Sequence, residues 1–111
     1  MMHVTFADKS LLIGDEIAEL LLEYATAIAD RGRADQVTIR AIGGDGNEVD
    51  VHLLLDSGTI IAAESTNSTA NPPDNRDNIE DIRRRIDRLV TPPSLHESAV
   101  QIGDRQWLDE F

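Results

Sequence analysis

Two glycine-containing turns divide residues 36–63 into three segments of strand length. In the first two segments every second residue is apolar: Val37, Ile39 and Ala41, then Val49, Val51, Leu53 and Leu55. A period of two places successive side chains on opposite faces of a strand, and turns with glycine connect antiparallel neighbours. The pattern therefore predicts a three-stranded antiparallel meander over residues 36–63.

The N-terminal segment predicts one or two further short strands. Residues 3–6 alternate in the same way, and residues 10–13 either pair back onto them as a second strand or begin a helix at Ser10. Gly14 would then lie in the first turn of that helix, where glycine is unfavourable. The sequence favours a strand over residues 10–13 but leaves both alternatives open.

Two later segments have apolar residues at helical spacing. The first runs from Asp15 to Arg31 and is followed by Gly32, a residue that commonly ends helices. The second begins near Asp74 or Asn75 and ends at Leu89, before two prolines. The apolar stripes are Ile17, Leu21, Tyr24 and Ile28 in the first helix, and Ile79, Ile82, Ile86 and Leu89 in the second.

The stripe of the first helix is widened by Leu20, Leu22 and Ala25. A well-covered core helix explains this width, and a second apolar seam used for self-association is the alternative. The order of elements predicts an α+β fold with two layers, in which a mostly antiparallel sheet is covered on one face by two helices. We expect residues 1–90 to form this single domain and residues 91–111 to form a C-terminal tail. The element order is similar to that of profilin-like, longin and roadblock-type domains, and this resemblance implies a dimeric interaction platform.

The chain carries 21 acidic against 10 basic residues, a formal net charge of −11 on 111 residues. This field repels phosphate backbones and anionic lipid head groups, so neither nucleic acid nor a membrane is an expected partner. It favours a partner with a basic or apolar surface. The chain has no cysteine, no secretory-signal pattern and no apolar run of membrane-spanning length, and we expect a cytoplasmic protein.

No group of residues in the sequence predicts a metal site or a cofactor. Asp45, Asn47 and Asp50 resemble part of a calcium-binding loop, but that loop needs glycine at the position that Asp50 occupies. A hairpin turn explains the same residues. We therefore expect neither metal nor cofactor.

The histidines also lack the spacing of a zinc or general-base site. His52 is expected on the surface of its strand, opposite Arg40 or Thr38, while His3 and His96 are expected in solvent. The sequence accordingly predicts no enzyme activity.

One basic cluster stands out, the arginines at 83–85 and 88. Consecutive residues spread around a helix, so they do not form a single clamp. Glu80 with Arg84 and Asp81 with Arg85 have the i,i+4 spacing of stabilising ion pairs. This predicts a solvated, internally neutralised helix face.

The predicted contact surface combines the tail with two strand positions. Trp107 and Phe111 are half of the aromatic residues of the chain, and with Leu108 they form an aromatic anchor that is costly to leave in water. The anchor docks either on its own domain or on another chain. Ile42 and Leu54 lie on the outer side of their strands among polar neighbours. These residues predict a non-catalytic binding or regulatory protein that forms a homodimer.

Two other functions fit the sequence. An inhibitor or immunity-type protein would use the acidic field to mask a basic protein surface. A small-ligand-binding domain or weak enzyme would have its pocket between helix and sheet. That third function needs polar side chains that point inward, and the predicted core positions contain almost none.

Overall fold

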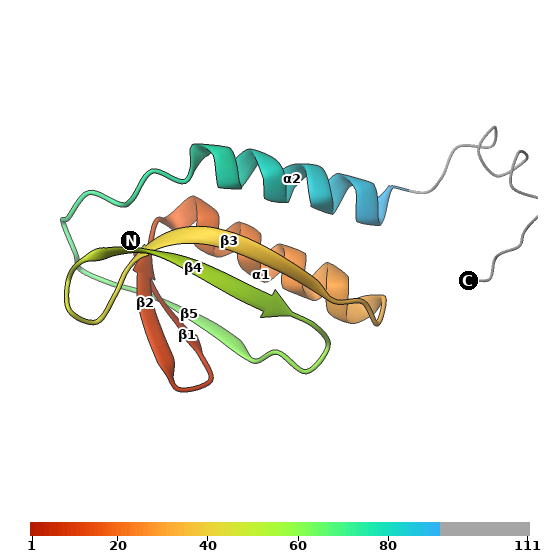
Figure 1. Cartoon of the computed structure of the whole chain (residues 1–111), viewed down its shortest axis with the longest axis horizontal. Coiled ribbons are helices and arrows are strands. Elements are labelled where there is room, and N and C mark those ends of the chain that lie inside the picture. Colours follow the sequence, from red (N-terminus) through yellow and green to blue (C-terminus); the bar gives the residue numbers. More distant parts are fainter. Residues whose placement is uncertain (92–111) are drawn as a thin grey trace, which may run out of the picture.

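The computed structural model describes residues 1–91, which form five strands and two helices. In chain order these are β1 (Met2–Phe6), β2 (Lys9–Ile13), α1 (Asp15–Asp30), β3 (Asp35–Ile42), β4 (Glu48–Leu55), β5 (Ile61–Ser65) and α2 (Arg76–Val90). All five strands belong to one antiparallel sheet with the order β4-β3-β2-β1-β5 (Figure 1). The predicted α+β fold is confirmed, and residues 10–13 are a strand. No helix in residues 1–91 has the length and apolar character needed to cross a membrane.

The structure differs from the predicted meander in the partner of the third strand. β3 and β4 form the predicted hairpin and pair along their whole length. β5 does not lie beside β4; it pairs with β1 at the opposite edge of the sheet. This position packs Ile61 and Ala63 against the core, next to the fully buried Val4. A glycine turn marks where β4 ends, but it does not determine which strand β5 joins.

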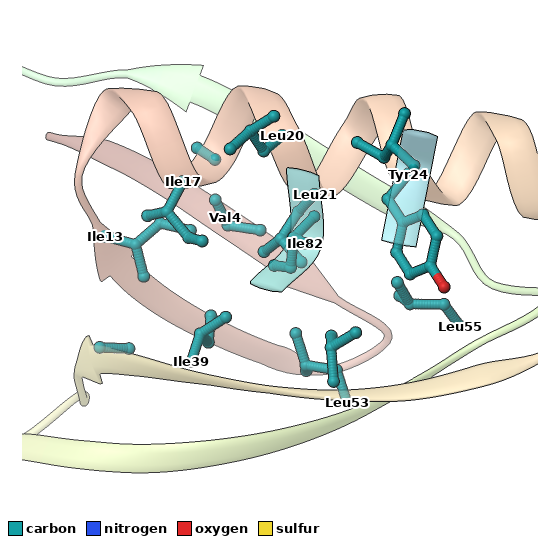
Figure 2. Packing of buried hydrophobic residues seen from close by; sticks show 14 of the residues in the cluster. Val4, Ile13, Ile17, Leu20, Leu21, Tyr24, Ile39, Leu53, Leu55 and Ile82 are labelled. Atoms are coloured by element: carbon teal, nitrogen blue, oxygen red, sulfur yellow. The ribbon is translucent and has the colours of Figure 1, made fainter. Parts of the chain in front are cut away.

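One hydrophobic core lies between the sheet and the helices. The predicted stripe of α1 is buried, and Figure 2 shows Ile17, Leu21 and Tyr24 of that stripe facing strand residues such as Ile39 and Leu55. Leu20 is buried as well, because α1 packs against α2 in addition to the sheet. The wide stripe thus fits a core helix that contacts two neighbours.

The ends of α1 agree with the sequence. Gly32 has a φ of 60°, in the left-handed region that glycine adopts at low cost. The N–H groups of Gly32 and Arg33 donate to the carbonyls of Ala29 and Ile28, and these bonds close the last turn of the helix. The chain is thereby turned directly into β3.

The sheet is narrow at its centre. β2 and β3 form a single backbone pair, Leu12 with Ile42, and the remainder of β3 has α2 alongside it (Figure 1). The backbone groups on this side of β3 therefore need partners other than a strand.

Asn75, immediately before α2, supplies two of those partners. Its side chain is buried, with 5% of the residue exposed. The Asn75 Oδ1 accepts the Arg40 N–H at 2.8 Å, and its Nδ2 donates to the Arg40 carbonyl at 2.8 Å. Asn78 donates a further hydrogen bond to Oδ1. The Asn75 side chain thus makes the backbone hydrogen bonds that a neighbouring strand would make. At the start of α2, the Arg76 N–H donates to the Asp74 carboxylate.

Candidate functional site

The structure places Ile42 and Leu54, two predicted contact residues, far apart on the β3–β4 hairpin. Ile42 pairs with Glu48 near the turn, whereas Leu54 pairs with Gln36 at the open end. Leu54 is 66% exposed, and Ile42 is partly buried. The two side chains do not form a continuous surface with each other.

Trp107, Leu108 and Phe111 lie outside the described residues. The aromatic anchor therefore stays a prediction.

Leu54 lines an apolar groove at the open end of the hairpin. Ile60, which is 81% exposed, lies in the same groove, together with Phe6 from the opposite part of the sheet. We call it the Leu54–Ile60 groove; it has a volume of about 360 Å³ and is lined by Phe6, Ala7, His52, Leu53, Leu54, Gly58, Thr59 and Ile60.

Hydrogen bonds hold the loop that carries Ile60. The Asp56 carboxylate accepts the Gly58 N–H at 2.8 Å, and the Thr59 hydroxyl oxygen accepts the Asp56 N–H at 2.9 Å. The Thr59 N–H also donates to the Asp56 carbonyl. Ile60 is thus presented to solvent by an internally bonded turn.

A polar groove of about 620 Å³ lies between the outer side of the hairpin and the start of α2. His52 is on the strand surface opposite Thr38 as predicted, with Nδ1 and the hydroxyl 3.0 Å apart. Arg40 pairs with Glu48 at 3.0 Å and Asp50 at 3.6 Å. The cations of this groove are matched by neighbouring carboxylates.

Asp74 at the rim of the same groove has a perturbed pKa. Hydrogen bonds from the side chain and the N–H of Arg76 lower the pKa of Asp74 to about 2. Both side chains are exposed, so this ion pair contributes little to stability.

His3 lies between two partners that the sequence did not reveal. Its Nε2 contacts the Ser10 hydroxyl, and its Nδ1 lies 3.2 Å from Oε1 of Glu64. The order hydroxyl, imidazole, carboxylate is that of activated serine nucleophiles. Acyl transfer also needs donors aimed at the oxyanion in a water-excluded site, and here the three side chains lie on an open sheet face. We describe the group as a cross-strand hydrogen-bond network.

The pairing of β5 with β1 is what brings these three side chains together. His3 lies directly opposite Glu64 in that pairing, and Ser10 is on the other neighbour of β1. The predicted meander ended at residue 63 and placed its third strand beside β4, so the contact between His3 and Glu64 could not be inferred.

A second polar cluster joins α1, β3 and α2. The Tyr24 hydroxyl donates to Asp35 Oδ2 at 2.5 Å, and Arg85 Nη1 donates to the same oxygen at 2.6 Å. Arg85 also donates to the Gln36 carbonyl at 3.1 Å and pairs with Asp81 at 2.9 Å. We call these residues the Arg85 cluster.

The cluster shifts the pKa values of its members. Burial, and then the hydrogen bond to Asp35, raise the pKa of Tyr24 to about 12. Burial opposes ionisation of Asp35, but hydrogen bonds from Tyr24, Arg85 and the Gln36 N–H outweigh it and lower the pKa of Asp35. The Asp35 hydrogen bond also raises the pKa of Arg85. At neutral pH the cluster holds an ionised Asp35, a charged Arg85 and a protonated Tyr24.

The Arg85 cluster forms one wall of a groove between the C-terminal ends of both helices. We call it the Arg33–Arg88 groove; it has a volume of about 500 Å³ and is lined by Tyr24, Ile28, Arg33, Ala34, Asp35, Asp81, Arg85, Arg88 and Leu89. Within residues 1–91, no carboxylate forms an ion pair with Arg33 or Arg88. The groove therefore has apolar, aromatic and cationic lining in one place.

The arginines of α2 are used differently from the prediction. Arg85 pairs with Asp81 as expected, but Arg84 pairs with Asp81 and not with Glu80. Arg83 reaches across to Glu16 of α1. The arginines of α2 thus connect this helix to both α1 and β3, because Glu16 and Asp35 lie within reach of their guanidinium groups.

Within residues 1–91, no three acidic or histidine side chains converge as metal ligands would. The Asp45 carboxylate accepts the N–H and the side-chain amide of Asn47, as in a hairpin turn.

No protein-family model, curated protein or solved structure matches this chain.

Proposed function

We propose that this chain is a small, acidic, cytoplasmic binding or regulatory protein that forms a homodimer through the Leu54–Ile60 groove. The observation that supports this most is the exposure of two large aliphatic side chains, 66% for Leu54 and 81% for Ile60, in one groove. Moving one such side chain fully out of water is worth about 1.5–3 kcal/mol. A partner surface that covers both recovers this free energy. The proposal assigns no reaction to the chain.

The occupant that we propose is a second copy of the chain. The groove lies beside β4, an edge strand whose outer backbone groups have no neighbouring strand in the described sheet. Two copies related by a two-fold axis would bring the same edge and the same aliphatic side chains together, as in an isologous dimer.

Charge gives this proposal a distinctive salt dependence. Two chains of charge −11 repel each other, and dissolved salt screens that repulsion. A dimer held by apolar contact should therefore become tighter as ionic strength rises.

Sedimentation equilibrium of the full chain over a series of concentrations and salt concentrations tests the proposal. We expect a dimer for the wild type and a monomer for Leu54→Asp and Ile60→Asp. Val90→Asp is the matched control, because Val90 is also exposed (45%) but lies on α2. A wild type that remains monomeric in every condition would overturn the proposal, provided that circular dichroism shows it folded.

One observation favours the immunity-type alternative. All five charged residues of α1 are acidic and exposed: Asp15, Glu16, Glu19, Glu23 and Asp30. Such a face would steer a basic protein toward the chain, and salt would weaken that complex. The opposite responses to salt separate the two functions.

A further inference from the structure

The Arg33–Arg88 groove lies where the described chain ends. Leu89, one of its lining residues, is two positions before Thr91. The segment that follows contains the only tryptophan of the chain, Trp107. We propose that the groove binds residues 104–111 of the same molecule, with the Trp107 side chain against its apolar and cationic lining.

The composition of the segment matches the groove. Trp107, Leu108 and Phe111 offer apolar surface, and the groove offers Ile28 and Leu89. An indole ring also provides a face on which an arginine guanidinium packs favourably. Groove volumes of several hundred Å³ accommodate side chains of this size.

The charges are complementary as well. Residues 92–111 contain one arginine and four acidic residues, Glu97, Asp104, Asp109 and Glu110. The groove contains three arginines and two carboxylates, and two of those arginines, Arg33 and Arg88, have no ion pair within residues 1–91. By contrast, the exposed charges of α1 are all acidic and would repel the segment. The groove is thus a cationic site on an acidic molecule.

The connection is long enough for docking within one molecule. Trp107 lies sixteen positions after Thr91, and an extended chain advances about 3.3 Å per residue. Tethering gives the segment a high effective concentration at a groove on its own chain, which favours this site over the same groove of another molecule. The proposal is independent of the dimer, because the two grooves share no lining residue.

The absence of cysteine and the single tryptophan allow a direct test in the full chain. A bimane label attached to Ala34→Cys, within the groove, is quenched when tryptophan contacts it. We expect this quenching to be lost when Trp107→Phe is added. A label on Ser68→Cys, in the exposed loop before α2, is the control and should be unaffected by Trp107→Phe.

Charge reversal tests the electrostatic part. Arg33→Glu and Arg88→Glu should release the label from quenching and shift the Trp107 emission to the red, whereas Arg76→Glu at the other end of α2 should do neither. Adding Asp109→Arg with Glu110→Arg to Arg88→Glu should restore the quenching.

Two results would overturn the proposal. One is an Ala34→Cys label that is equally bright with and without Trp107 in a folded protein. The other is quenching of a labelled Trp107→Phe protein on mixing with unlabelled wild type, because this would place the segment on a second molecule.

Discussion

The two helices are attached to the same sheet by different kinds of contact. α1 buries a wide apolar stripe, with Ile17, Leu21 and Ile28 almost completely removed from solvent. α2 buries only Ile82 and Ile86, and it relies in addition on hydrogen bonds to the backbone of β3. Hydrophobic burial has no preferred direction, whereas a hydrogen bond does. The comparison indicates that burial holds α1 to its layer, while directed bonds fix the position of α2 along a strand edge.

The most severe test of this comparison is a cavity under α1. Leu21 is completely buried, so Leu21→Ala should lower the free energy of unfolding by about 2–5 kcal/mol. Leu22, the next residue, is partly exposed, and Leu22→Ala should cost clearly less. Urea unfolding followed by circular dichroism measures both. Equal losses would mean that the stripe does not carry the attachment of α1.

The corresponding test under α2 removes a polar side chain. Asn75→Ala leaves the N–H and the carbonyl of Arg40 without their partner, and we expect a loss of about 2–4 kcal/mol from two unsatisfied backbone groups. Asn75→Asp keeps an acceptor but removes the donor to the Arg40 carbonyl, so it should not rescue stability. Asn47→Ala, in an exposed turn, is the control. Hydrogen exchange at the Arg40 amide should accelerate more in Asn75→Ala, which removes its acceptor, than in Asn75→Asp, which keeps it.

The Arg85 cluster predicts a smaller, pH-dependent effect. Tyr24 is the only tyrosine, so its absorbance reports a pKa of about 12 directly. Asp35→Asn should lower that pKa, although burial keeps it above the ordinary value of 10.0. Asp30→Asn, on the exposed face of α1, should leave it unchanged.

The signs of the two linked stability effects are opposite. The pKa of Tyr24 is higher in the folded protein, so its contribution is complete below pH 10 and is lost as pH rises towards 12. The pKa of Asp35 is lower in the folded protein, so its contribution is complete above the ordinary value of 3.8 and is lost as pH falls. Urea unfolding at several pH values should show both decreases in the wild type. In Asp35→Asn both decreases should be smaller; part of the acid one should remain, because Asp74 and Asp45 also have lowered pKa values.

The smallest change in stability is expected at the exposed ion pair between the two helices. Arg83 and Glu16 are both about half exposed, so Glu16→Gln should change stability by about 0–1 kcal/mol, and less in high salt. Thermal unfolding at low and high ionic strength measures this. A larger, salt-independent loss would show that the helices are linked by a polar contact as strong as the one between α2 and β3.

The sequence predicted the part of the fold that depends on periodicity. The β3–β4 hairpin and both helical stripes follow from which face of each element is apolar, and this can be read from residue spacing. The partner of β5 could not be read in this way, because the same alternating pattern fits the edge of β4 and the edge of β1.

The polar contacts were missed for a related reason. The sequence predicts that the second helix begins near Asp74 or Asn75 and that Arg85 lies on a solvated helix face, and neither prediction indicates a contact with β3. Their actual partners, the backbone of Arg40 and the Asp35 carboxylate, are distant in sequence. Of the contact residues that the sequence proposed, Leu54 lies in a groove, and the aromatic anchor is still to be tested.

The position of β5 beside β1 has a consequence for how this protein folds. The β1–β2 and β3–β4 hairpins close short loops, but Val4 meets Ala63 only after the intervening chain has been brought round. Closing this long loop costs conformational entropy before the contacts between β1 and β5 can stabilise it, and the step is therefore slow. We expect β5 to join late, so that weakening it accelerates unfolding while leaving the refolding rate nearly unchanged. The lifetime of the native state would then depend on a five-residue pairing at one edge of the sheet.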